Sequence, residues 1–113
     1  MNEFKPTDFD SLNYNNAEYS TKLFTHDKEN KIFIGELSEL DKNVFKQIYE
    51  DACDEGLTLI SEKSGNKSDW FVSNFEYVNL PDKELLAIHL LPTPETIRKF
   101  PGLKNYNMVL LND

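Results

Sequence analysis

The chain has 113 residues, enough for one domain with one modest hydrophobic core. Residues 1–56 hold thirteen acids and six lysines and so carry −7, while residues 57–113 carry −1, which together give the net charge of −8. This balance argues against direct binding to nucleic acid or to an anionic membrane surface, because both require a positive footprint. The single cysteine excludes an intrachain disulfide and favours a reducing, cytoplasmic setting.

Residues 1–16 show no hydrophobic period and are rich in asparagine, which predicts an extended, partly disordered N-terminal arm. Its aromatic residues Phe4 and Phe9 lie among acids, and such an arm can dock on a partner. In a second interpretation, Phe9 and Leu12 pack on the domain's own surface. Residues 17–113 are predicted to form a single domain.

Two alternating, β-rich segments follow the arm. Residues 19–25 (YSTKLFT) and 31–37 (KIFIGEL) are separated by a charged turn at residues 26–30. This spacing predicts a β-hairpin with a loop of four or five residues.

Residues 38–56 are predicted to form an amphipathic helix. Apolar residues recur there at steps of three or four, which is the helical period. The stripe consists of Leu37, Leu40, Val44, Ile48 and Ala52, widened by Phe45, Tyr49 and Cys53. Ser38 is the expected N-cap, with Asp41 completing a capping box, and Gly56 is the expected C-terminal stop.

The last turn of this helix carries four acids where the helix dipole favours cations. They are Glu50, Asp51, Asp54 and Glu55. Glu50 with Asp54, and Asp51 with Glu55, are like-charge pairs four residues apart, and each costs roughly 0.2–0.5 kcal/mol on an exposed helix. Local stability therefore does not account for these acids. They form either an acidic patch that meets a basic partner or the solvated face of an acidic protein.

Four strands and a short helix are predicted after Gly56. The strands are residues 57–63, 68–78, 85–91 and 107–111, and Thr93 caps a short helix that ends at residues 101–102. Residues 85–91 are the most apolar run and are expected to be a central strand buried on both faces. The order ββαβββαβ predicts an α+β domain, with a mainly antiparallel sheet and the main helix packed on one face.

Alternation along residues 68–78 predicts two faces for this aromatic strand. One face is expected to carry Trp70, Val72 and Asn74, and the other Phe71, Ser73, Phe75 and Tyr77. Core packing accounts for most of these side chains. A face left exposed would be a protein-binding patch.

No residue pattern indicates catalysis, a metal site or a cofactor. His89 lies in an apolar strand without a second histidine nearby, so it is interpreted as a structural histidine rather than a general base. Cys53 lies on the apolar stripe near the negative end of the helix and is expected to be buried and unreactive. The acids lack the loop of a calcium hand, and the four isolated glycines form no phosphate-binding loop.

The sequence favours a small, non-enzymatic interaction protein that binds a basic protein partner. The expected contacts are Glu50, Asp51, Asp54, Glu55, Phe4 and Phe9. Inhibitors encoded by phages and mobile elements, and immunity proteins that neutralise toxins, are often of this size and charge. The most specific form of this hypothesis is that the chain blocks the nucleic-acid-binding groove of its partner.

Two alternatives stay open from the sequence. The first is a small enzyme or ligand-binding domain whose site lies between the sheet and the helix, near His89 and Tyr77. The second is a homodimer built on an exposed sheet edge or on an aromatic sheet face, without a separate partner.

Overall fold

The computed structural model describes residues 11–14, 17–37, 40–56 and 69–112. Within them the secondary-structure elements are β1 (Ser11–Tyr14), β2 (Ala17–Ser20), β3 (Lys22–Asp27), β4 (Ile32–Glu36), α1 (Lys42–Glu55), β5 (Trp70–Asn79), β6 (Glu84–Pro92), α2 (Pro94–Lys99), the 3-10 helix η2 (Pro101–Leu103) and β7 (Asn107–Asn112). The predicted α+β class is confirmed. The strand predicted at residues 57–63 lies outside the described residues.

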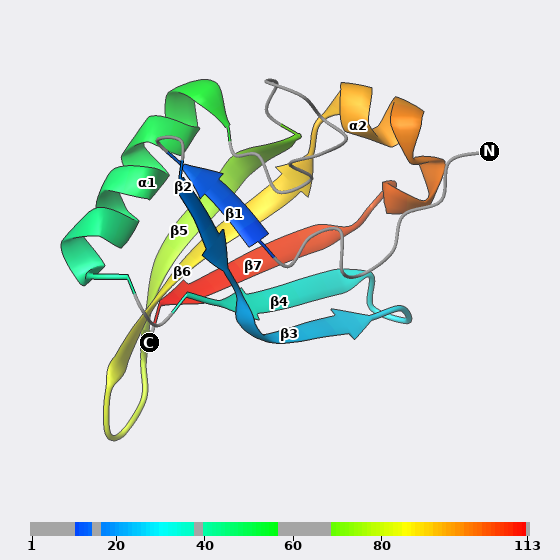
Figure 1. The fold of residues 1–113 in the computed structure, drawn as a ribbon. Helices are drawn as coiled ribbons and strands as arrows, with labels where there is room; N and C mark the ends of the chain where they lie inside the picture. The colour runs from blue at the N-terminus through cyan, green and yellow to red at the C-terminus, as the bar shows by residue number, and fades with distance from the viewer. Residues whose placement is uncertain (1–10, 15–16, 38–39, 57–68, 113) are drawn as a thin grey trace.

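The strands form two sheets (Figure 1). β1 and β2 pair as an antiparallel hairpin, and the other five strands form one sheet in the order β3-β4-β7-β6-β5. All neighbours in this sheet are antiparallel except β4 and β7, which run parallel. The sheet is therefore mixed, although antiparallel pairing dominates as predicted, and the last strand of the chain is its middle strand.

Part of the predicted N-terminal arm belongs to the folded domain. Residues 11–14 are strand β1, and Leu12 is fully buried in the hydrophobic core. Tyr19 on β2 packs against the same core. The burial of Leu12 agrees with the second interpretation of this segment, whereas Phe4 and Phe9 lie outside the described residues.

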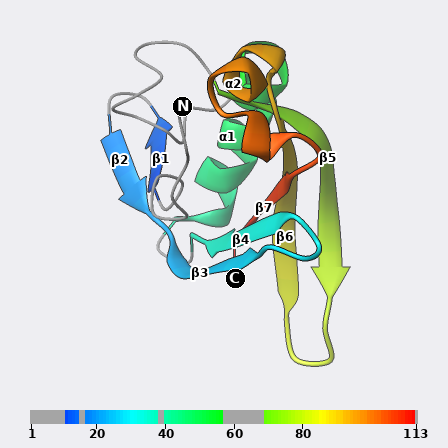
Figure 2. The same cartoon turned by 90° about the vertical axis from the view of Figure 1, so that its right-hand side faces the viewer.

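The main core lies on one side of the five-stranded sheet. α1 and the β1–β2 hairpin lie on that side, as the two views in Figure 1 and Figure 2 show. The core cluster consists of Leu12, Phe33, Leu37, Phe45, Ile48, Ala52, Trp70, Leu86, Ile88, Leu90, Phe100, Leu103, Tyr106, Met108 and Leu110. No described helix or strand covers the other side in either view, and we call that side the open face.

α1 packs through a narrower and slightly rotated version of the predicted stripe. Phe45, Ile48 and Ala52 are buried, whereas the Val44 side chain is 39% exposed. The N-cap prediction is wrong: the helix begins at Lys42, and the extended residue Asp41 is the N-cap, with its Oδ1 accepting from the Asn43 N–H at 2.7 Å. The predicted stop at Gly56 is confirmed, since its φ is 77° and its N–H donates to the Ala52 carbonyl at 2.8 Å.

A β-bulge changes the predicted faces of β5. The pairing with β6 shifts between Val72 and Asn74, so alternation resumes one residue later. Phe75 consequently packs against the core on the same side as Trp70, and the predicted division of faces is wrong beyond Val72. Tyr49 of α1 lies against Phe75, with ring centroids 4.4 Å apart.

β6 is an internal strand, as predicted from its apolar sequence, because it pairs with β5 and with β7. Leu86, Ile88 and Leu90 point into the main core. Of the β6 residues on the open face, Ala87 is buried, whereas Leu85, His89 and Leu91 are half-buried. The predicted burial on both faces therefore holds for Ala87 but not for the whole strand.

α2 begins as the sequence predicts. Thr93 is the N-cap, its Oγ1 accepts from the Thr96 N–H at 3.3 Å, and Pro94 occupies the first turn. The Thr96 hydroxyl donates to the Asp69 carbonyl at 2.9 Å, which ties α2 to the residue that precedes β5. Neither described helix has the length and apolar character needed to cross a bilayer.

Candidate functional site

The acidic end of α1, which comprises Glu50, Asp51, Asp54 and Glu55, forms where the sequence predicts it. Glu50, Asp54 and Glu55 are exposed, and Asp51 is half-buried. The last turn contains no basic residue that would neutralise them from within the helix. The Asp51 carboxylate accepts a hydrogen bond from Gln47 Nε2 at 3.0 Å, and Asp51 and Glu55 make further interactions. Glu50 and Asp54 are therefore the acids that we consider for an external contact.

Cys53 is exposed, so its predicted burial is wrong. The reason is the rotation of the buried stripe: Ala52 faces the core, and the next residue lies about 100° further round the helix. Cys53 instead lies beside Tyr49 one turn earlier. The pKa of Tyr49 is raised above its ordinary value of 10.0, first by a hydrogen bond with Cys53 and then by its Coulombic interaction with Cys53.

His89 lies on the open face of the sheet, on the opposite side from α1. Its neighbours Ile88 and Leu90 point into the core, and strand alternation turns the imidazole away from it. The His89 Nε2 lies 2.9 Å from the Glu76 Oε1, and these side chains are 31% and 49% exposed. A site between the sheet and α1, the first alternative from the sequence, would therefore contain Tyr77 but not His89.

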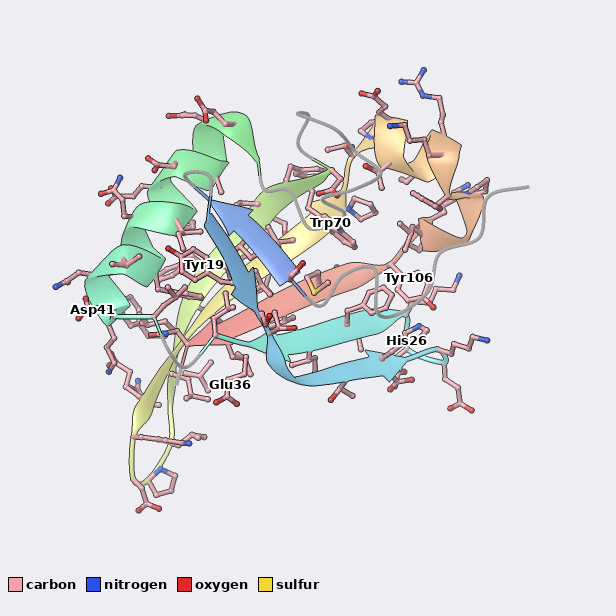
Figure 3. The ribbon with its side chains drawn as sticks, viewed as in Figure 1. Tyr19, His26, Glu36, Asp41, Trp70 and Tyr106 are labelled. Atoms are coloured by element: carbon pink, nitrogen blue, oxygen red, sulfur yellow. The ribbon has the colours of Figure 1, made fainter. Side chains whose placement is uncertain are left out.

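The rings of His26, Phe33 and Tyr106 form a cluster that the sequence did not reveal, and Figure 3 labels two of its members, His26 and Tyr106. The His26 Nε2 is 2.9 Å from the Tyr106 hydroxyl, and the His26 ring stacks on Phe33 at a centroid distance of 4.5 Å. Phe33 in turn stacks on Tyr106 at 4.9 Å. His26 and Tyr106 are 80 residues apart, so only the sheet order, in which β4 lies between β3 and β7, reveals their contact.

Burial and nearby charges favour the neutral forms of both side chains. The pKa of His26 lies below its ordinary value of 6.5, because burial disfavours the charged ring and Lys28 adds positive charge, while Asp27 acts in the opposite direction. The pKa of Tyr106 lies above 10.0, first because of burial and then because of the charge of Asp27.

A pH dependence follows from the lowered pKa of His26. As the pH is lowered through 6.5, this histidine takes up a proton in the unfolded chain but not yet in the folded chain. The free energy of unfolding therefore decreases as the pH is lowered, until the folded pKa has been passed. Urea unfolding over a pH series is expected to show a smaller fall in His26→Gln than in the parent chain. His89→Gln is the control and should keep the His26 contribution. Equal slopes in His26→Gln and the parent chain would contradict this assignment.

The structure brings the four predicted acids together on one helix, but the described residues do not include the two predicted arm contacts, Phe4 and Phe9. Within the described part of the chain, no group of three or more His, Cys, Asp or Glu side chains is placed to hold a metal ion. Comparisons with protein-family models, with curated proteins and with solved structures gave no match to this chain. Its function is therefore inferred from its own residues and contacts.

Proposed function

We propose that this chain is a small, non-catalytic interaction protein that binds a basic protein partner through the acidic end of α1. One observation supports the proposal: Glu50 and Asp54 are exposed four residues apart in a helix whose last turn contains no basic residue. This arrangement lowers helix stability, because the like charges repel each other and oppose the helix dipole. Contact with the cations of a partner accounts for the acids at these positions, whereas the stability of the helix does not.

The charge of the whole molecule supports the same proposal. The chain carries −8, and the excess is concentrated in residues 1–56, which include α1. A negative surface speeds diffusional encounter with a positive groove and suppresses binding to acidic surfaces. A partner whose groove binds nucleic acid would be inhibited, because the carboxylates occupy the position of the phosphates. Inhibitors from phages or mobile elements and toxin-immunity proteins are the functional classes that fit this mechanism.

Charge reversal tests the proposal directly. The immobilised chain is used to capture a partner from an extract of the native host, and the affinity of the purified partner is then measured. Glu50→Lys combined with Asp54→Lys is expected to weaken binding by roughly tenfold or more, since close charge pairs across interfaces are worth about 1.5 kcal/mol or more. The melting temperature should be unchanged or higher, because the substitutions remove a repulsion and place cations at the end that favours them.

A matched control separates the site from the net charge. Asp82 and Glu84 are exposed acids near the turn between β5 and β6, so Asp82→Lys with Glu84→Lys changes the net charge by the same amount at another place. This control should bind within about twofold of the parent chain, since long-range steering alone is screened at physiological salt. Equal losses of affinity in the two double variants, or unchanged affinity in the α1 variant, would show that the acidic end of α1 is not the binding site.

A further inference from the structure

The inner strands of the five-stranded sheet carry apolar side chains on the open face as well as on the core face. Strand alternation, read from the pairing registers, places Ile32, Ile34, Leu91, Ala87, Val109 and Leu111 on the open face. Ala87 is only 1% exposed and Val109 only 9%, whereas Phe71 at the edge of this face is 42% exposed. The apolar side chains that reach this surface are therefore Phe71 and the half-buried Ile32, Ile34, Leu91 and Leu111, and apolar groups exposed together on a folded domain are a feature of interaction sites.

Two acids flank the centre of this apolar surface. Glu36 on β4 pairs in register with Leu111 on β7, Leu111 pairs with Ala87 on β6, and Ala87 pairs with Glu76 on β5. One row across the sheet therefore has the order acid, leucine, alanine, acid. Glu36 points away from α1 in Figure 3. The two carboxylate positions are three strand spacings apart, or about 14 Å.

The charges on this face favour a basic partner over a second copy of the chain. Two copies packed face to face would bring Glu36 and Glu76 from each molecule into the same interface. The net charge of −8 on each copy adds long-range repulsion. A partner with cations on both sides of an apolar group avoids this cost.

We infer that the open face of the sheet is a second docking surface, which takes a protein segment with an apolar side chain flanked by lysine or arginine on each side. An extended segment fits this spacing: basic residues four apart lie about 13 Å from each other and share one face with the apolar residue between them. The inference rests on the proposed function in that the partner is basic, but it concerns the opposite side of the sheet from α1.

The test uses a defined probe, the acetylated and amidated peptide Lys-Thr-Leu-Thr-Lys, titrated into the isotope-labelled chain and followed by amide chemical shifts. We expect saturable shifts at Ala87, Leu111 and Glu76. The peptide Gln-Thr-Leu-Thr-Gln should produce much smaller shifts. Glu36→Gln and Glu76→Gln, which preserve side-chain size, should each weaken binding by roughly two- to fivefold, as for a surface charge contact. Asp82→Asn, which removes one exposed acid in the turn between β5 and β6, is the matched control and should leave binding unchanged.

Three outcomes would overturn the inference. Shifts confined to α1 would remove the open face as a docking surface and leave the proposed function intact. The absence of shifts at both surfaces would also remove the open face as a docking surface. It would leave the proposed function intact, because binding through α1 is tested separately with the captured partner. A concentration-dependent dimer that Leu111→Ser converts to monomer would assign the open face to a second copy of the chain.

Discussion

Replacing Phe45 by alanine is expected to lower the free energy of unfolding by about 3–5 kcal/mol, the usual cost of removing a buried phenylalanine side chain. Phe45 is fully buried and belongs to the cluster that joins α1 to the sheet. A domain of this size has a total stability of roughly 5–15 kcal/mol, so this loss is a large share. Urea unfolding, read from both the midpoint and the slope, measures it.

The matched control is the preceding residue. Val44 is 39% exposed, and Val44→Ala should change the free energy of unfolding by no more than about 0.5 kcal/mol, because alanine is also the better helix former. If Phe45→Ala does not fold, Ile48→Val at another buried position should cost about 0.5–1.5 kcal/mol. A larger effect at Val44 than at Phe45 would mean that α1 packs through the stripe centred on Val44 that the sequence predicted.

Asn112→Asp is expected to destabilise the chain by roughly 3 kcal/mol or more. Asn112 is 1% exposed, and its Nδ2 donates to the Leu37 carbonyl at 2.8 Å and to the Leu40 carbonyl at 2.9 Å. These bonds hold the connection between β4 and α1 against the end of β7. The substitution keeps the side-chain size but removes both donors and directs a buried carboxylate toward two carbonyl oxygens.

The same substitution at Asn107 is the control, because this residue is exposed at the other end of β7. Asn107→Asp should stay within about 0.5 kcal/mol of the parent chain. The loss in Asn112→Asp should shrink at acid pH, where a protonated carboxyl group can donate one bond. A pH-independent loss, or equal losses at the two positions, would show that the side-chain amide of Asn112 does not hold this connection.

The sequence alone determined the features that depend on local order. The helical period between Leu40 and Ala52, the C-terminal glycine and the cap at Thr93 act within a few residues, so α1 and α2 were predicted close to their observed positions. The acidic end of α1 follows from the same local pattern. Its use as a binding surface stays a prediction.

Only the tertiary structure decided which surfaces the chain presents. The bulge after Val72 moved Phe75 to the core side, and a rotation of the buried stripe exposed Cys53. The parallel pairing of β4 with β7 joined Glu36 to Leu111, 75 positions away, and so created the open face. Such contacts depend on which distant segments satisfy each other's backbone hydrogen bonds and bury each other's side chains, and no short window of residues contains that information.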